Sequence, residues 1–295
     1  MSNLEISRAQ RLDQKVVELV PELSRGFAAR LVEDGKVTVN GAVQTKAGYK
    51  LRDGDKVMVD YDIRELEQVP DINLPVLYED DDCVVINKPV GVLAHSKGVF
   101  NPEATVASWL RERIADHKNA NLKDSPLINN RAGIVHRLDR ATSGVMICAK
   151  TPDALSWLQK QFATRNVQKT YAAVVKGALS PAEAIVDMPI ERNPKAPATF
   201  RVGMQGKSAK TAYKTLATND KYSLVELKPE TGRTHQLRVH LNHLGHPIVG
   251  DTLYGGEPAD RLYLHAERLE LTILAGHERK VFTAPVPPEF SERVE

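Results

Sequence analysis

The sequence predicts an α+β protein with a small N-terminal unit and a larger C-terminal domain. Short helix-like and strand-like segments mix along the chain without the regular strand–helix alternation of a doubly wound parallel sheet. Residues 61–75 show no clean hydrophobic period and contain two prolines, which is typical of a linker. We therefore expect three parts, at residues 1–60, 61–75 and 76–295.

The first 60 residues have the pattern of a compact α+β unit. Apolar residues between Leu12 and Val20 predict a helix that ends before Pro21. Ser24 is a suitable N-cap for a second helix, and Gly35 stands where that helix should end. Two alternating segments then predict strands, at residues 36–40 and 56–60.

The C-terminal domain shows strand-like apolar runs and at least two helices. Thr151 followed by Pro152 predicts the start of one helix. Thr234 is expected to cap a second, short helix whose leucines 237, 241 and 244 share one face. The apolar runs that predict strands lie at residues 84–86, 145–149, 171–175 and 224–227.

Composition excludes several classes of protein. Hydrophobic residues make up 42% of the chain and charged residues 26%, which favours a folded core over global disorder. No apolar run approaches the roughly 18 residues of a membrane span, and the first residues lack the pattern of a secretory signal. Only two cysteines occur, Cys83 and Cys148, so we expect no disulfide framework and a reducing cytoplasmic location.

Charge is unevenly distributed along the chain. Residues 61–82 carry a net charge of −7, and the remaining residues carry +9. A polyanionic partner and an ordinary solvated surface both fit this distribution. The glycine-rich loops of nucleotide-binding proteins and the Gly-x-Ser-x-Gly turn of α/β-hydrolases are missing, so we expect no nucleotide cofactor.

Four histidines cluster near the predicted short helix, at positions 235, 240, 243 and 246. Imidazole is a common zinc ligand, but the cluster has no cysteine nearby and its spacing matches no standard site. Polar helix positions or donors that face RNA explain these histidines better. We therefore expect no metal.

Two polar segments carry the candidate chemistry. In residues 131–144, Asp139 stands between Arg137 and Arg140, which would keep its carboxylate charged as a nucleophile or base. An aspartate in such a loop is also often a simple turn or cap residue. In residues 228–247, Arg238 is either a surface cation or a clamp for a carboxylate or phosphate.

Taken together, these segments resemble the RluA family of RNA pseudouridine synthases. The resemblance covers about residues 76–290, and the motifs occur in the order of the family. They are Asn87-Lys-Pro89 with Gly91, His136-Arg-Leu-Asp139, Thr142-Ser-Gly144, Lys169-Thr-Tyr171, Gly232-Arg-Thr-His-Gln-Leu-Arg238, Gly245-His-Pro-Ile-Val-Gly-Asp251 and Leu264-His-Ala266. The chain departs from the family after Asp139, where Arg-Ala and Val145 replace the more common Lys-Asp and Leu.

Residues 8–60 resemble the RNA-binding module named after the fourth small-subunit ribosomal protein. The residues that carry this resemblance are Arg11-Leu-Asp13, Ser24-Arg25, Leu31, Gly35 and Val37-Thr-Val-Asn-Gly41. The resemblance implies phosphate contacts from basic side chains, which add affinity rather than base identity. These side chains are Arg8, Arg11, Arg25, Arg30 and Lys36.

The resemblance also implies a fold and a set of roles. The catalytic domain would have a mixed, mostly antiparallel sheet. Asp139 would be the required carboxylate, Arg238 would pair with it, and Tyr171 would stack against the uracil and help to move the C5 proton. The target uridine would be flipped out of its RNA stem, and Arg137 would fill the gap left in the stack. Leu264 would cover the second face of the base, and His136 would also belong to the substrate-binding residues.

Several functions remain open from the sequence. The leading expectation is isomerisation of uridine in large-subunit ribosomal RNA by a monomer, since residues 91–98 and 187–194 resemble the D-type members of the family. Transfer RNA is the alternative substrate, and a non-catalytic RNA-binding or ribosome-assembly protein is the alternative class. A glycoside hydrolase would need two paired carboxylates, for which Asp139 and Asp251 are the only candidates.

Overall fold

The structure is a computed structural model, and it describes residues 10–21, 23–60, 71–95, 103–115, 127 and 132–295. The expected linker at 61–75 is therefore described only from residue 71, and Arg8 lies outside the described residues. No helix in the described part of the chain is long and apolar enough to cross a membrane.

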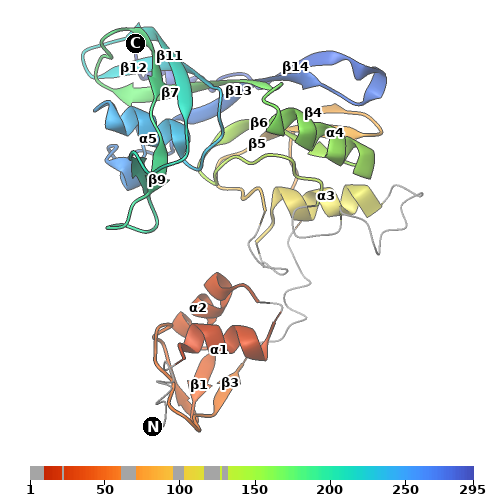
Figure 1. Cartoon of the computed structure of the whole chain (residues 1–295), viewed down its shortest axis with the longest axis vertical. Coiled ribbons are helices and arrows are strands. Elements are labelled where there is room, and N and C mark those ends of the chain that lie inside the picture. Colours follow the sequence, from red (N-terminus) through yellow and green to blue (C-terminus); the bar gives the residue numbers. More distant parts are fainter. Residues whose placement is uncertain (1–9, 22, 61–70, 96–102, 116–126, 128–131) are drawn as a thin grey trace, which may run out of the picture.

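The N-terminal unit has its own hydrophobic core and forms a separate body in Figure 1. Ser24 caps its second helix as predicted, because its hydroxyl accepts a hydrogen bond from the Phe27 N–H at 3.2 Å. The first helix ends before Pro21, also as predicted. The elements are helices α1 (Leu12–Leu19) and α2 (Arg25–Glu33) and strands β1 (Val37–Val39), β2 (Ala42–Val43) and β3 (Val57–Val59). The strands form a sheet in the order β2-β1-β3.

Two of the arginines expected to contact RNA form ion pairs with a buried carboxylate of this unit. Arg11 Nε lies 2.9 Å from one oxygen of Asp13, and Arg25 Nε lies 2.9 Å from the other. The Asp13 side chain is almost fully buried, whereas both arginines are about half exposed. These ion pairs connect the start of α1 to the start of α2, so Arg11 and Arg25 have a structural role beside any contact with RNA.

The large domain is built on one mixed sheet of nine strands. Its path is β4-β5-β6-β13-β7-β12-β11-β8, and β14 pairs with β13. Every pairing is antiparallel except that of β13 with β6, which agrees with the mixed, mostly antiparallel sheet that was expected. The strands are β4 (Val76–Glu79), β5 (Cys83–Lys88), β6 (Ser143–Ala149), β7 (Gln168–Lys176), β8 (Glu183–Asp187), β11 (Lys210–Thr218), β12 (Tyr222–Pro229), β13 (Leu264–Thr272) and β14 (Arg279–Thr283). A separate two-stranded sheet joins β9 (Ile190–Arg192) and β10 (Phe200–Val202).

Helices cover the two halves of the sheet and create two hydrophobic cores. Helices α3 (Val106–Ala115) and α4 (Pro152–Ala163) pack in the half that contains β5 and β6, and α5 (Gln236–His243) packs in the half that contains β7 and β12. The chain ends with the short helix α6 (Glu289–Glu292). Tyr171 on β7 contacts both cores, so it marks the junction between the two halves.

The parallel pairing of β13 with β6 depends on Gly144. This residue has φ +118°, and a Cβ there would lie 2.2 Å from the Ala266 carbonyl oxygen. His265 pairs with Ser143 and Ala266 with Gly144. This close approach brings the loop before β6 next to the start of β13, where Leu264 lies.

The predicted start of the short helix was wrong by one residue. His235 rather than Thr234 is the N-cap of α5, and it makes no side-chain capping bond. His235 has φ +56°, a left-handed conformation that is uncommon for a residue with a Cβ. Such strain often accompanies a functional constraint. Here the His235 ring contacts the Tyr254 hydroxyl and lies near Asp139. For α4, Thr151 is the N-cap as predicted, and its hydroxyl accepts a bond from the Ala154 N–H at 3.2 Å.

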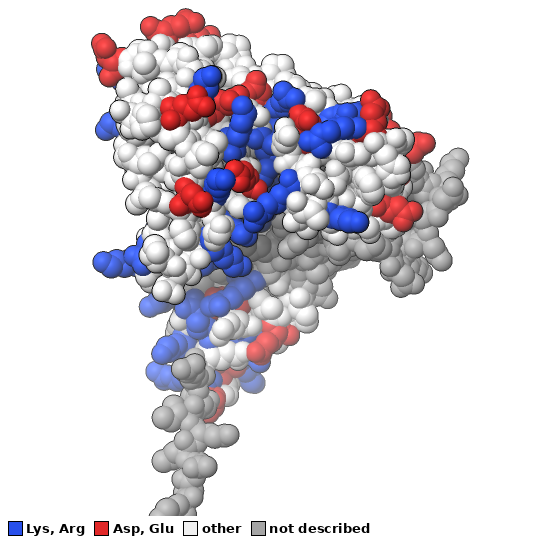
Figure 2. All heavy atoms as spheres, turned by 45° about the horizontal axis from the view of Figure 1, so that its top comes forward, with Lys and Arg blue, Asp and Glu red and all other residues white. Residues whose placement is uncertain are grey.

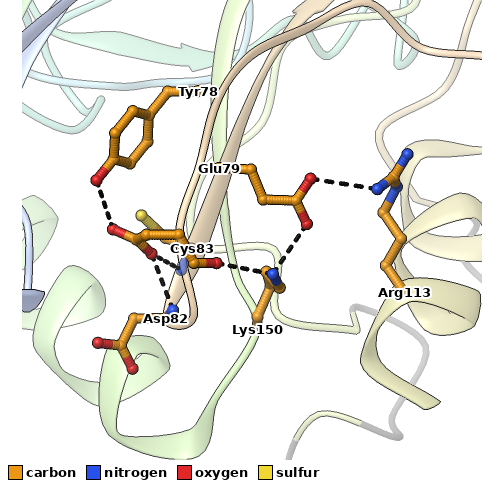
Figure 3. A network of polar contacts seen from close by, with 7 residues as sticks. Tyr78, Glu79, Asp82, Cys83, Arg113 and Lys150 are labelled. Carbon is orange, nitrogen blue, oxygen red and sulfur yellow. Dashed lines mark hydrogen bonds and ion pairs between the residues drawn. The ribbon is translucent and has the colours of Figure 1, made fainter. Parts of the chain in front are cut away.

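A polar network lies at the C-terminal end of β6, where Lys150 follows the strand (Figure 3). Lys150 donates to Glu79 at 2.9 Å and to the Asp80 carbonyl at 2.7 Å. The second oxygen of Glu79 lies 3.2 Å from Arg113 on α3. Asp80 accepts bonds from the backbone N–H groups of the turn before β5, which hold its pKa below the ordinary value despite the burial of its carboxyl. The network fixes β4, β6 and α3 as one scaffold.

Candidate active site

Asp139 lies in a small cavity of about 140 Å³ at the junction of the two halves of the sheet. Its loop is closed by a hydrogen bond from the Thr142 N–H to the Asp139 carbonyl at 3.0 Å. The Asp139 side chain is 23% exposed, so its carboxylate is accessible from the cavity. Four other residues to which the family resemblance assigns a role also line this cavity, namely Arg137, Tyr171, Arg238 and Leu264.

Arg238 holds two carboxylates, and the sequence revealed only one of them. Its Nη1 lies 3.6 Å from Asp139 Oδ2, an ion-pair distance that is too long for a hydrogen bond. Its Nε and Nη2 each donate to Asp251 at 2.7 Å. Asp251 is 2% exposed, so this bidentate pair is buried. The expected pairing of Arg238 with Asp139 is therefore present as an ion pair, and Asp251 is an additional partner that binds the other edge of the guanidinium.

Tyr254 and His235 complete a ring of contacts around Asp139. The Arg238 guanidinium lies over the Tyr254 ring, 4.9 Å from its centre. The Tyr254 hydroxyl lies 2.7 Å from His235 Nδ1 and accepts a bond from the Phe200 N–H at 2.9 Å. His235 Nε2 lies 3.7 Å from Asp139 Oδ2. Burial lowers the pKa of His235, which favours the neutral form of the ring beside the carboxylate.

Tyr171 stands beside Asp139 on β7 and keeps its proton. Burial raises the pKa of its hydroxyl, and the Asp139 carboxylate raises it further. A neutral phenol ring can therefore face a bound base in the cavity. Leu264, which is 3% exposed, supplies an apolar wall of the same cavity.

His136 was expected to contact the substrate and Arg140 to lie beside the Asp139 carboxylate, but both side chains have other partners. His136 lies outside the small cavity, where its Nε2 accepts a bond from the Ile147 N–H at 3.0 Å and its ring stacks on Phe162 at 4.6 Å. Burial lowers the pKa of His136 to about 3, so this ring is neutral. Arg140 pairs with Glu103. Within the described part of the chain, the arginine within ion-pair distance of Asp139 is Arg238 rather than one of its neighbours in sequence.

Two lysines near the site, one buried and one half-buried, were not predicted as functional residues. Lys88 is fully buried, and its Nζ donates to the carbonyls of Pro89 and Val92 at 2.8 and 2.9 Å. It also approaches the Arg140 carbonyl at 3.4 Å, which connects β5 to the Asp139 loop. Lys169 lines the cavity and donates to the Thr231 carbonyl at 3.3 Å. Burial lowers the pKa of each lysine to about 8.

The histidine cluster has polar partners in the protein. His240 contacts the Thr211 hydroxyl and the Met188 carbonyl, each at 3.0 Å, and His246 contacts the Lys176 carbonyl at 2.8 Å. Among the residues that the structure describes, no group of three or more His, Cys, Asp or Glu side chains could hold a metal ion.

The pair Asp139 and Asp251 lacks the arrangement of a glycosidase. Both carboxylates lie around one guanidinium, so the two residues are close together in the fold. However, Asp251 is buried outside the cavity lining and both of its oxygens accept bonds from Arg238, so it is not placed to act on a leaving group. Among the described residues that line the cavity, Asp139 is the one accessible carboxylate.

Two family models match the chain. The model described as RNA pseudouridylate synthase matches residues 82–243, and the S4 domain model matches residues 10–57. A curated relative named ribosomal large subunit pseudouridine synthase D, from Vibrio parahaemolyticus, is 37% identical over 95% of this chain and 88% of its own length. A relative of the same name from Escherichia coli K12 is 36% identical over 97% of this chain and 90% of its own.

Solved structures with a similar fold carry the name of the same enzyme family. The structure titled human RNA pseudouridylate synthase domain containing 1 superposes with a TM-score of 0.58 at 30% identity, over 72% of this chain and 83% of that one. Human RNA pseudouridylate synthase domain containing 4 gives a TM-score of 0.56 at 27% identity, over 74% and 90%. The fold and the matches define an enzyme that isomerises uridine in RNA. The chain belongs to the RNA pseudouridylate synthase family, and an S4 domain precedes its catalytic region.

Proposed function

We propose that this enzyme converts uridine to pseudouridine in large-subunit ribosomal RNA and that Asp139 is the reacting carboxylate. The single observation that supports this role best is its position. Asp139 is the accessible carboxylate of a cavity that also presents a phenol ring, an apolar wall and an arginine. Curated relatives at 36–37% identity over nearly the whole chain carry the name of a large-subunit ribosomal enzyme.

The reaction needs few groups from the protein. The bond from N1 of the base to C1′ of the ribose breaks, the base turns, and a bond from C5 to C1′ forms. C5 then loses its proton, and N1 gains one, so no electrons enter or leave. A charged carboxylate beside the sugar–base bond serves this sequence whether it adds to the sugar, adds to the base or removes a ribose proton.

The remaining residues position the uridine. Tyr171 would stack on one face of the base and help to move the C5 proton. Leu264 would cover the other face. A uridine in a stem reaches the cavity only when it is flipped out, at a cost of a few kcal/mol. Arg137 is exposed at the mouth of the cavity and would fill the gap left in the RNA stack.

The N-terminal unit would add affinity for the ribosomal RNA. We assign residues 1–60 to RNA binding, 61–75 to a linker and 76–295 to catalysis. Arg11, Arg25 and Arg30 would contact phosphates, together with Lys36. We expect the enzyme to act as a monomer. Cys83 and Cys148 are buried free thiols, which agrees with a cytoplasmic enzyme.

Mapping pseudouridine in the RNA of cells that lack this protein tests the substrate directly. We expect the loss of specific pseudouridines from large-subunit ribosomal RNA, and their return with the wild-type gene but not with Asp139→Asn. Loss confined to transfer RNA would contradict the ribosomal substrate and leave the chemistry intact. Restoration by Asp139→Asn would instead favour a non-catalytic RNA-binding protein.

A further inference from the structure

A second hollow, which the reaction itself does not use, opens beside the catalytic cavity. Its volume is about 450 Å³, within the range of about 300–1,000 Å³ that is typical of ligand sites. It shares Arg137, Lys169, Tyr171 and Arg233 with the catalytic cavity, so a single chain of nucleotides can enter both. The chemistry of its walls differs from that of the first cavity.

The floor of this hollow is apolar and its rim is cationic. Val135, Phe162, Ala163 and Val167 form the apolar part, and Phe162 is fixed by its stacking on the neutral ring of His136. Arginines and a lysine form the rim, at positions 137, 165, 169 and 233. Figure 2 shows that Lys and Arg side chains gather in a band on this view of the molecule, between larger areas without charge.

Three of these cations lack an anionic partner among the described residues. In the part of the chain that the structure describes, no carboxylate lies within ion-pair distance of Arg137, Arg165 or Lys169. Of the described residues that line the hollow, Glu230 alone is acidic, and it pairs with Lys210 at 2.9 Å. Lys169 is close enough to Arg165 for the arginine to contribute to the lowered pKa of the lysine. Like charges held together in this way favour an anion between them.

We propose that this hollow binds the nucleotide adjacent to the target uridine on the same RNA strand, with its phosphate between Arg165 and Lys169 and its base on the apolar floor. The inference rests on the proposed function, because it assumes that a uridine occupies the neighbouring cavity. An apolar platform with a cationic rim is the usual arrangement for an unpaired nucleotide.

Arg165 provides the cleanest test because its side chain is exposed and its backbone tolerates glycine. It follows α4 with φ +60°, a conformation that glycine adopts without strain, so Arg165→Gly is expected to fold. Lys160→Ala is the matched control, since it removes the same charge from an exposed position on the preceding helix α4, away from the hollow. Arg165→Lys tests whether charge alone restores binding.

The assay uses the full-length protein and a short transcript of large-subunit RNA that contains the mapped uridine. For Arg165→Gly we expect KM to rise about fivefold to tenfold with kcat within about twofold, and the slope of log K against log salt to fall by about 0.7. Arg165→Lys should recover most of the affinity, and Lys160→Ala should match the wild type. In addition, an abasic nucleotide on one side of the target should raise the wild-type KM by about tenfold.

The outcomes separate this proposal from the proposed function. An unchanged KM and salt slope in Arg165→Gly would overturn the phosphate site, and tolerance of abasic nucleotides on both sides would overturn the base platform. A wild-type protein that forms no pseudouridine in any RNA would instead overturn the proposed function.

Discussion

At the scale of single residues, Asp251 determines the orientation of Arg238. Two charge-assisted bonds of 2.7 Å fix one edge of the guanidinium, and only Nη1 remains directed at Asp139. The Tyr254 ring supports the guanidinium from one face. Asp251 does not line the cavity, so we expect it to act as a positioning residue, through Arg238.

Asp251→Asn should lower kcat by about tenfold to a hundredfold and leave KM nearly unchanged, because a misoriented Arg238 affects the reacting carboxylate more than RNA binding. The free energy of unfolding should also fall by about 1–3 kcal/mol, since the buried guanidinium loses its charged partner. Steady-state kinetics and urea unfolding measure the two effects. Asp260→Asn is the control, because this exposed carboxylate lies 3.5 Å from Arg293 and outside the cavity. A wild-type kcat in Asp251→Asn would contradict the positioning role.

Lys169 should make RNA binding depend on pH. Burial lowers its pKa to about 8, so the ammonium is charged below pH 8 and loses its charge as the pH rises through that value. Affinity for RNA should therefore weaken above about pH 8, with the midpoint moved upward in the complex because a phosphate favours the charged form.

Titration of the dissociation constant between pH 7 and 10 measures this dependence. Lys169→Arg should remove the pH dependence in this range, because arginine keeps its charge there. An equal pH dependence in the wild type and in Lys169→Arg would show that another group is responsible.

The sequence could predict the residues of the site that carry chemistry better than the contacts that hold those residues in place. Asp139, Tyr171 and Arg238 belong to recognisable motifs, and the structure brings them into one cavity. Nothing local marks Asp251 as the main partner of Arg238, because this contact depends on how the chain folds back after α5. The sequence instead suggested Arg137 and Arg140 as partners of Asp139. Among the described residues, Arg140 pairs with Glu103, and Arg137 lines the cavity without an ion pair to Asp139.

At the scale of the elements, the site depends on the parallel pairing of β13 with β6. Gly144 permits this pairing, because any side chain there would collide with the backbone of Ala266. The same pairing places the Asp139 loop beside Leu264. A change that separates the two strands should therefore affect folding and activity together.

Gly144→Ala should destabilise the protein by about 2–4 kcal/mol, because a positive φ and a contact of 2.2 Å act together. Gly245→Ala is the matched control, because this glycine also has a positive φ but no described atom lies within 4 Å of the position that a Cβ would take. It should cost only about 1–2 kcal/mol. Urea unfolding midpoints of the two variants give the comparison, and equal midpoints would contradict the role of the close contact.

Elements with strong patterns were predictable, and those set by tertiary contacts were not. Ser24 and Thr151 cap their helices as predicted, because a hydroxyl at an N-cap is a local preference. The start of α5 was misplaced because His235 adopts a left-handed conformation to reach Tyr254. Strand β2 has only two residues, too few to show a period.

At the scale of the whole molecule, we expect the N-terminal unit to add affinity for RNA to that of the catalytic domain. The N-terminal unit has a separate core, and the described residues that line the cavity all belong to the large domain. Arg11 and Arg25 also hold Asp13, so their replacement would disturb the fold. Arg30 and Lys36 are better probes of RNA binding.

The double variant Arg30→Ala/Lys36→Ala should raise KM for long ribosomal RNA by roughly tenfold or more and reduce the salt slope by about 1–2. On a short transcript that reaches only the catalytic domain, the variant should match the wild type. Lys214→Ala/Lys221→Ala removes the same charge from exposed positions on the β11–β12 hairpin and is the control. An equal effect on both RNA lengths would contradict the separation of roles.

The proposed chemistry depends above all on one carboxylate, that of Asp139. Formation of the bond from C5 to C1′ releases the hydrogen at C5, so tritium release from RNA that contains [5-³H]uridine reports turnover directly. We expect the wild type to release tritium, and Asp139→Asn to bind the same RNA within about threefold of the wild-type affinity while losing at least about a thousandfold in turnover. Release at the wild-type rate by Asp139→Asn would show that another group carries out the isomerisation.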